Sequence, residues 1–163
     1  MGYEVIDNFL SEEDHGKIYN SMLSAEFPWY FNDYPTQPKE TDTVYNYQFT
    51  HMFYLNNEAT SQFVNLLDPI YKKLGINFIH RIKANLSPAT PETRVGRWHT
   101  DFEIDCKTAV YYVNTNNGFT KFRSGEIVES LANRIVIFDS LDLHVGATAT
   151  DVKARCLINF NYS

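Results

Sequence analysis

The chain has little cysteine, no long apolar run and no excess of positive charge, and each shortage excludes a class of protein. Its two cysteines, Cys106 and Cys156, lie far apart and form no Cys-x-x-Cys pair, which excludes a disulfide framework. No apolar stretch approaches the roughly 20 residues that span a bilayer, and the first residues lack the basic and apolar regions of a secretion signal. We therefore expect a cytoplasmic protein with no membrane segment.

The charge and size narrow the class further. The formal net charge is −6 at pH 7, which argues against broad, charge-driven binding to nucleic-acid phosphates. Hydrophobic residues make up 44% and aromatic residues 15% of the 163 positions, too many for a disordered chain. A chain of this length can bury one core, and no repeat or linker divides it. We expect a single domain over residues 1–163, in which 1–76 supports a core at 77–163.

The first half mixes helix and strand patterns. The expected elements are a strand at 3–6, a helix at 11–24, a loop with one short strand at 27–42, a strand at 44–55 and a helix at 58–74. Ser11 precedes three acidic residues, which is typical of a helix N-terminus. Pro69 is expected to kink or restart the second helix, and Gly75 to end it.

After residue 77 the pattern changes to short strands separated by turn signals. The expected strands lie at 77–86, 95–102, 107–114, 119–122, 126–129, 134–138, 143–147 and 153–161. Because no helix interrupts them, a mainly β sandwich or jelly roll is favoured over a parallel α/β sheet.

Three residues could bind one divalent metal ion. His99 and Asp101 fall in the strand expected at 95–102, where residues two apart point to the same side. His144, at the start of a later strand, could supply a third ligand. Two histidines and one carboxylate hold Fe(II) while leaving open positions for co-substrate and dioxygen. The His-x-Asp pair alone is a weak indication, because five histidines and ten aspartates give about 0.3 such pairs by chance.

Arg155 supplies a second indication. Alternation along the last expected strand places it on the same face as Asn159 and opposite Cys156, and the composition suggests that both faces are buried. A buried cation needs an anionic partner. An arginine fork could hold the free carboxylate of a diacid that chelates the metal through its other end. The alternative is an exposed Arg155 paired with Asp151 or Glu129.

Several segments together resemble a known family. They are His99-Thr-Asp101, Thr108-Ala-Val-Tyr-Tyr-Val-Asn114, Asn133-Arg-Ile-Val-Ile-Phe138, His144-Val-Gly146 and Arg155-Cys-Leu-Ile-Asn-Phe160. This combination, over roughly residues 78–162, resembles the prolyl-hydroxylase-like branch of the 2-oxoglutarate/Fe(II) oxygenases, of the small type carried by phages and marine microbes. The resemblance implies a mainly β fold, a double-stranded β-helix (jelly roll, cupin-like) with N-terminal supporting helices. Asn133 stands where the family often has glycine, a tolerable change because asparagine accepts left-handed geometry.

The resemblance also implies cofactors and residue roles. The cofactors would be Fe(II), 2-oxoglutarate and dioxygen, with ascorbate as an additional reductant. The residues that match the family's site are His99, Asp101 and His144 as iron ligands, Arg155 and Tyr112 at the far carboxylate of 2-oxoglutarate, Asn159 facing the same pocket, and Asn85 at the iron-proximal carboxylate or the substrate.

The reaction implied is hydroxylation of a C–H bond in a peptide, a protein side chain or a free amino acid, with release of succinate and CO2. Two alternatives remain open: oxidative dealkylation of nucleic-acid bases, which the acidic balance disfavours, and a non-catalytic jelly-roll module that binds a metal. Oligomeric state is not predicted. Tyr45 and Tyr47 could line the substrate entrance, although an aromatic strand is more often core, and His15, His51 and His80 are expected to be structural.

Overall fold

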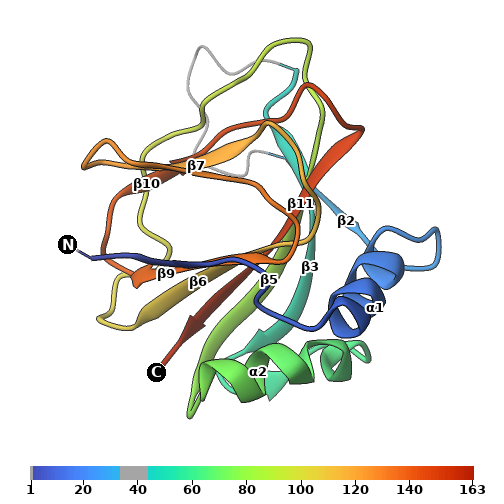
Figure 1. Cartoon of the computed structure of the whole chain (residues 1–163), viewed down its shortest axis with the longest axis vertical. Coiled ribbons are helices and arrows are strands. Elements are labelled where there is room, and N and C mark those ends of the chain that lie inside the picture. Colours follow the sequence, from blue (N-terminus) through green and yellow to red (C-terminus); the bar gives the residue numbers. More distant parts are fainter. Residues whose placement is uncertain (1, 34–43) are drawn as a thin grey trace.

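The computed structural model describes residues 2–33 and 44–163 and contains two antiparallel sheets (Figure 1). The large sheet contains β1 (Glu4–Ile6), β2 (Tyr30–Asp33), β3 (Tyr47–Leu55), β4 (Glu58–Ala59), β5 (Ile79–Pro88), β6 (Lys107–Tyr112), β9 (Arg134–Asp139) and β11 (Ala154–Tyr162). The small sheet contains β7 (Phe119–Phe122), β8 (Ile127–Glu129) and β10 (His144–Gly146). The helices are α1 (Glu12–Met22), a 3-10 turn at Val64–Leu67 and α2 (Asp68–Leu74). The predicted mainly β, jelly-roll architecture with N-terminal helices is confirmed.

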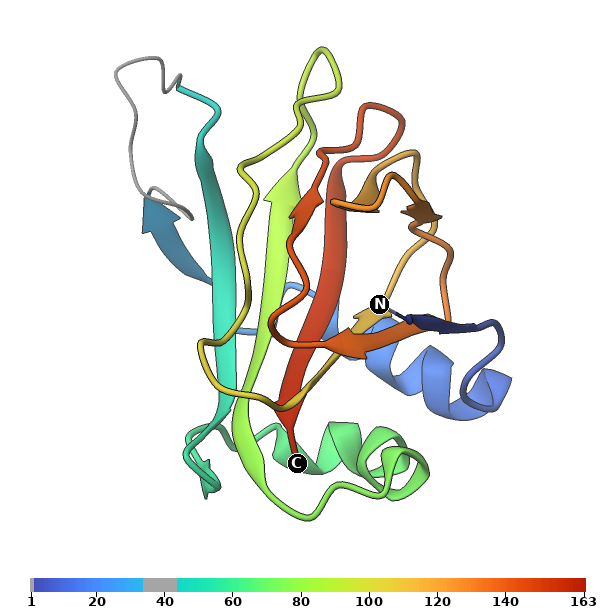
Figure 2. The same cartoon turned by 90° about the vertical axis from the view of Figure 1, so that its left-hand side faces the viewer.

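Strands distant in sequence are neighbours in the large sheet. Its order is β1-β9-β6-β11-β5-β3-β2, with β4 paired to β3, and every pairing is antiparallel. Figure 2 shows the long strands β3 (teal), β5 (green) and β11 (red) side by side. The N-terminal half therefore supplies strands at both edges of this sheet, β1 at one and β2 and β3 at the other, in addition to the helices. None of the described helices is both long and apolar enough to span a bilayer.

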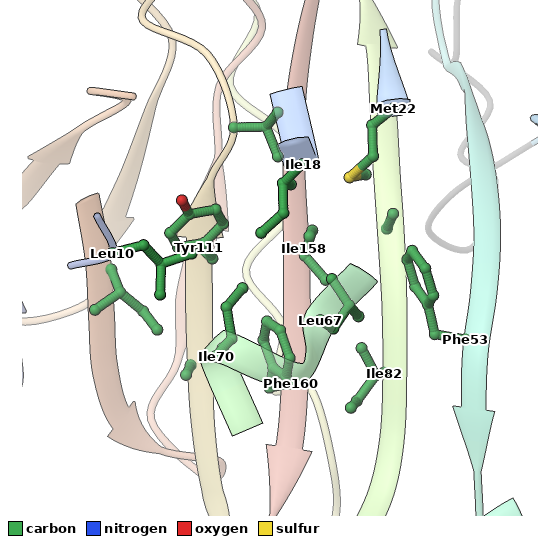
Figure 3. Close-up of a cluster of buried hydrophobic side chains, with 14 of the residues drawn as sticks. Leu10, Ile18, Met22, Phe53, Leu67, Ile70, Ile82, Tyr111, Ile158 and Phe160 are labelled. Atoms are coloured by element: carbon green, nitrogen blue, oxygen red, sulfur yellow. The ribbon is translucent and has the colours of Figure 1, made fainter. Parts of the chain in front are cut away.

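The large sheet buries both of its faces, each against a different partner. Both helices lie on the side of the sheet that faces away from β7 and β10 (Figure 1). Ile18 and Met22 from α1 and Ile70 from α2 are fully buried in one hydrophobic cluster with Ile158 and Phe160 of β11 (Figure 3). The opposite face packs a smaller cluster, including Val110 and Leu157, against residues of the small sheet. Burial on both faces explains why β11 is an almost uninterrupted run of buried residues.

Seven of the eight strands predicted after residue 77 are present, with ends within two residues of the prediction. The strand predicted at 95–102 is wrong. Only two isolated bridges form there, Val95 with Ala147 and His99 with His144. The segment touches β10 through the Gly96 N–H to Gly146 O bond (2.9 Å) and the reciprocal His99–His144 backbone bonds (3.0 Å each). With so few paired residues no continuous ladder forms, and the chain bends at Asp101.

The helix predicted over 58–74 is also wrong in its first half. Asn56 and Asn57 both have positive φ angles, 50° and 61°. Two consecutive left-handed residues form the tight turn that suits a two-residue hairpin, and Glu58 pairs back with Leu55. Helix α2 begins only at Asp68, with proline in its first turn, and ends at Gly75 with a φ of 64°. The restart at Pro69 and the stop at Gly75 were predicted correctly.

Asn133 connects the N-terminal segment to the jelly roll. Its φ of 63° is the left-handed geometry expected there. Its side chain does more than tolerate that geometry: Oδ1 accepts from the Leu10 N–H (2.8 Å) and the Tyr111 hydroxyl (3.0 Å), and Nδ2 donates to Leu10 O (2.9 Å). Asparagine at this position therefore satisfies buried groups that glycine could not.

Candidate metal centre and pocket

His99, Asp101 and His144 converge on one point. One potential ligand atom from each lies within 4.8 Å of the other two. His144 Nε2 lies 3.6 Å from Asp101 Oδ2, and His99 Nε2 lies 3.9 Å from Asp101 Oδ1. The backbone bridge between His99 and His144 fixes the separation of the histidines, and the bend after His99 brings Asp101 back toward them. The convergence results from one bridge and a bend, and not from two residues of one strand as the sequence suggested.

Both histidines are oriented by backbone carbonyls. His99 Nδ1 lies 2.9 Å from Arg97 O, and His144 Nδ1 lies 3.0 Å from Asp142 O. A carbonyl oxygen can only accept, so in each neutral imidazole the proton belongs on Nδ1 and the Nε2 lone pair faces the other two residues. This outer contact is typical of metal-binding histidines.

Burial favours the neutral form of His144. Its ring packs against Phe138, with ring centroids 4.9 Å apart, and its exposed fraction is only 4%. This burial lowers the pKa of His144 below its ordinary value, and the nearby Asp101 carboxylate only partly opposes the shift. The neutral imidazole is the form that binds a metal ion.

Asp101 has a buried oxygen without a partner. Its side chain is 5% exposed, and Oδ2 makes no hydrogen bond to any residue in the described part of the chain. Arg81 approaches from the side, with Nη2 3.8 Å from Oδ1 and 3.2 Å from the Asp101 carbonyl oxygen. A buried carboxylate oxygen left unsatisfied is costly. The donor set of two Nε2 lone pairs and one carboxylate therefore fits a bound divalent cation that would satisfy it.

Arg155 is buried at another part of the same pocket. Its exposed fraction is 5%, so the alternative of an exposed arginine paired with Asp151 or Glu129 is excluded. Its Nε donates to Ser130 Oγ (2.8 Å) and its Nη2 to Thr120 Oγ1 (3.3 Å). No carboxylate within residues 2–33 and 44–163 forms an ion pair with it. Burial lowers the pKa of the guanidinium, yet arginine remains charged in proteins.

Tyr112 lies behind the pocket wall. It is fully buried, and its hydroxyl donates to Thr120 Oγ1 (2.8 Å). Thr120 itself lines the pocket and accepts from both Tyr112 and Arg155, so its own O–H proton is left to donate toward the cavity. The sequence prediction overlooked Thr120; the signal was its place two residues after Gly118 in a short strand, where alternation turns it inward. A direct role for Tyr112 at a carboxylate stays a prediction.

Asn159 and Asn85 both line the pocket. The register places Asn159 opposite Lys83 and Asn85 opposite Leu157 on adjacent strands. Each has a buried Oδ1 with no donor in the described part of the chain. The alternation predicted for β11 is observed: Arg155 and Asn159 face the pocket while Cys156 belongs to the helix-side core.

The pocket has a volume of about 750 Å³. Its wall also carries Tyr45 and Tyr47, and several polar or charged residues that the sequence did not single out, chiefly Gln48, Arg81, Lys83, Arg94 and Arg97. The expectation that Tyr45 and Tyr47 belong to the core is wrong: Tyr45 lies in the turn before β3 and is 39% exposed, and Tyr47, the first residue of β3, is only half-buried.

The remaining histidines have structural contacts, as expected. His51 is buried between Pro28 O (2.8 Å from Nδ1) and Ser61 Oγ (2.8 Å from Nε2). His15 contacts the Tyr111 hydroxyl at 2.7 Å, and His80 Nε2 lies 2.9 Å from Ser163 Oγ.

Comparison with known proteins gives matches by structure only. No protein-family model matches the chain, and a search of curated proteins found no match. A prolyl hydroxylase from Trichoplax adhaerens, solved with a hypoxia inducible factor peptide fragment, is similar with a TM-score of 0.67 and 14% identity over 99% of this chain and 83% of that one. A viral collagen prolyl hydroxylase from Paramecium Bursaria Chlorella virus-1, solved with 2OG, is similar with a TM-score of 0.64 and 15% identity over 98% of this chain and 94% of that one.

A third similar structure, a 2OG-Fe(II) oxygenase family oxidoreductase from Burkholderia pseudomallei, gives a TM-score of 0.70 and 12% identity over 99% of this chain and 85% of that one. At these identities the likeness establishes the fold. The chain has the jelly-roll fold of the prolyl-hydroxylase-like 2-oxoglutarate/Fe(II) oxygenases, and the resemblance predicted from the sequence is confirmed at that level.

Proposed function

We propose that the protein is a 2-oxoglutarate- and Fe(II)-dependent oxygenase that hydroxylates a C–H bond of a peptide, a protein side chain or an amino acid, with release of succinate and CO2. One observation carries the proposal: a single pocket contains three converging metal-ligand atoms and, separately, a buried arginine with no acidic partner in the described chain. A diacid that chelates a metal at one end and meets the guanidinium at the other satisfies both. The prolyl hydroxylases among the similar structures, one of them solved with a peptide, support this reading.

In this proposal His99, Asp101 and His144 hold the iron. The carbonyls of Arg97 and Asp142 keep both Nε2 lone pairs aimed at the ion. Asp101 supplies the anionic ligand, and Arg81 positions its backbone. With three protein ligands, the ion would keep coordination positions for exchangeable ligands.

Arg155 and Thr120 receive the far carboxylate of the diacid. Only two of the five guanidinium N–H donors are used by Ser130 and Thr120, which hold the side chain in place. The others can pair with a carboxylate in the bidentate manner. Val110 and Leu157 line the pocket wall with apolar surface, which excludes water and strengthens these charged contacts.

When bound, iron and 2-oxoglutarate would supply the oxidising chemistry, in which dioxygen is consumed and the diacid becomes succinate. The chain itself contributes position and shielding. Tyr47 and Gln48 on β3, with the segment before His99, form the wall past which a substrate would reach the metal.

The test is reconstitution with Fe(II) in the absence of air, followed by 2-oxoglutarate and dioxygen, with succinate quantified by mass spectrometry. We expect succinate release by the wild-type protein and by His80→Ala, a matched control outside the pocket, and none by His99→Ala or Asp101→Ala. A non-catalytic metal-binding module would bind the ion and release no succinate. Equal succinate release by the wild type and both site variants would refute the proposal.

A further inference from the structure

Lys83 places a positive charge inside the pocket. On β5 it lies between Arg81 and Asn85 on the pocket face, and all three line the cavity. The register puts it opposite Asn159 of β11. Its side chain is half-buried. Burial and the neighbouring Arg81 charge lower the pKa of its ammonium group, and the Asp101 carboxylate only partly opposes this shift.

Lys83 differs from Arg81 in having no fixed partner. Arg81 Nε donates to Asn161 Oδ1 (3.1 Å), and its Nη2 contacts the Asp101 backbone and carboxylate. Lys83 makes no hydrogen bond and no ion pair with any residue in the two described ranges. A partly desolvated ammonium with no carboxylate in contact is unfavourable, so this arrangement favours an anionic ligand.

The proposed metal and co-substrate do not supply that anion. This step rests on the proposed function. The two charges of Fe(II) and the Arg155 cation are balanced by the Asp101 carboxylate and the two carboxylates of 2-oxoglutarate. Lys83 and Arg81 then remain as unbalanced positive charges in a chain whose net charge is −6. The excess of positive charge in the pocket therefore results from the positions of these side chains, and not from a generally basic protein.

The position of Lys83 is suited to substrate. It is two residues from Arg81, which contacts Asp101 of the metal site, and the reacting C–H bond must also lie near the metal. The pocket volume of about 750 Å³ leaves room beyond a five-carbon diacid. Asn85, the next pocket-facing residue on β5, has an Oδ1 that accepts no hydrogen bond from the described residues. A substrate N–H group close to the anion could donate to this oxygen.

We propose that Lys83 is a specificity residue that binds an anionic group of the substrate, a carboxylate or a phosphate, so that this pocket selects negatively charged substrates over neutral analogues. Electrostatic complementarity of this kind gives specificity through the unfavourable burial of an unpaired charge when a neutral analogue binds.

The test uses Fe(II)-loaded enzyme with 2-oxoglutarate and three pairs of probes that differ by charge. The pairs are N-acetyl-L-proline with N-acetyl-L-prolinamide, O-phospho-L-serine with L-serine, and the peptide Gly-Glu-Pro-Glu-Gly with Gly-Gln-Pro-Gln-Gly. The first and third pairs report on a carboxylate and the second on a phosphate. Two quantities are measured: acceleration of succinate release, and the dissociation constant of each probe by calorimetry without air. The variants are Lys83→Met, Lys83→Arg and the control Lys121→Met, a strand lysine outside the pocket.

We expect the anionic member of at least one pair to bind the wild type at least tenfold more tightly than its neutral partner. Lys83→Met should weaken that binding by about thirtyfold or more and remove the preference. Lys83→Arg should restore the preference, and Lys121→Met should match the wild type. The dissociation constant of 2-oxoglutarate should change less than the constant of the anionic probe.

Three results would overturn the proposal: no anionic probe binding better than its neutral partner, an unchanged preference in Lys83→Met, or a larger loss of affinity for 2-oxoglutarate than for the probe. The last would make Lys83 a co-substrate residue. A wild-type protein that neither binds 2-oxoglutarate nor releases succinate would instead refute the proposed function, so the two failures are distinguishable.

Discussion

A Cβ atom added at Gly118 would lie 2.6 Å from Cδ of Arg155. No real contact is that short, so the observed position of the Arg155 side chain depends on the absence of a side chain at residue 118. The same added atom would also lie 2.9 Å from the carbonyl oxygen of Ala147, a backbone atom that cannot easily move. Glycine is required here by close approach and not by an unusual φ angle.

Replacing Gly118 with alanine should therefore damage both packing and co-substrate binding. We expect Gly118→Ala to lower the free energy of unfolding by about 1–3 kcal/mol, the usual result of overpacking, and to weaken 2-oxoglutarate binding by displacing Arg155. Gly16→Ala is the matched control, since nothing lies within 4 Å of its added Cβ and alanine favours a helix interior by about 0.5–1 kcal/mol. For each variant, urea unfolding measures the free energy of unfolding and calorimetry measures the affinity for 2-oxoglutarate. Normal 2-oxoglutarate affinity in Gly118→Ala would show that Arg155 does not need this space.

Arg155→Met should weaken 2-oxoglutarate binding without lowering the stability of the fold. Loss of the cation should weaken 2-oxoglutarate binding by about thirtyfold or more. The metal-free protein should be as stable as the wild type or more stable, because a buried charge without a carboxylate partner is replaced by an apolar side chain. Calorimetry and urea unfolding measure the two effects. Strong destabilisation combined with unchanged binding would mean that Arg155 is a structural residue.

Metal binding should stabilise the fold. A divalent ion that binds only the folded chain, at a free concentration one hundred times its dissociation constant, adds about 2.7 kcal/mol to the free energy of unfolding. We expect Fe(II) or Mn(II) to raise the melting temperature of the wild type, a chelator to reverse the rise, and His144→Ala to abolish it. Thermal unfolding with and without metal is the measurement, and a rise of equal size in His144→Ala would place the ion elsewhere.

The free energy of unfolding of the metal-free protein should fall in mild acid. Burial lowers the pKa of His51 and His15 below the ordinary value of 6.5. As the pH falls below that value, the unfolded chain binds protons that the folded chain does not, so the folded state loses stability until the lower folded pKa is reached. The slope is at most about 1.4 kcal/mol per pH unit for each histidine.

The contribution of His51 can be isolated with His51→Gln, whose amide can donate to Pro28 O and accept from Ser61 as the neutral imidazole does. We expect this variant to show a shallower pH dependence in urea unfolding between pH values of about 7.5 and 5.5. An identical dependence in the variant and the wild type would show that His51 does not take part.

Asn133→Gly should destabilise the protein although glycine accepts the local φ angle. The change removes the acceptor of the Leu10 N–H and Tyr111 hydroxyl and the donor to Leu10 O. Leaving these buried groups unpaired should cost about 1–3 kcal/mol. Asn133→Ala should cost more, because it adds strain at a φ of 63°. Urea unfolding ranks the three proteins, and a glycine variant as stable as the wild type would mean that only the backbone geometry matters.

Local patterns in the sequence determined much of this molecule. Alternation within β11 predicted that Arg155 and Asn159 share one face and Cys156 the other, because the period of a strand is fixed by its backbone. The turn residues placed most strand ends within two positions, since glycine and asparagine adopt the geometry that ends a strand at little cost.

Only the tertiary structure decided how the site is assembled. Asp101 reaches the histidines because one backbone bridge joins His99 to His144, 45 positions later, and the chain bends beyond it; no local pattern encodes such a pairing. The contributions of Thr120 and Lys83 were hidden for the same reason. Their inward direction follows from strand alternation, but the cavity they face exists only where two sheets formed by distant segments enclose it.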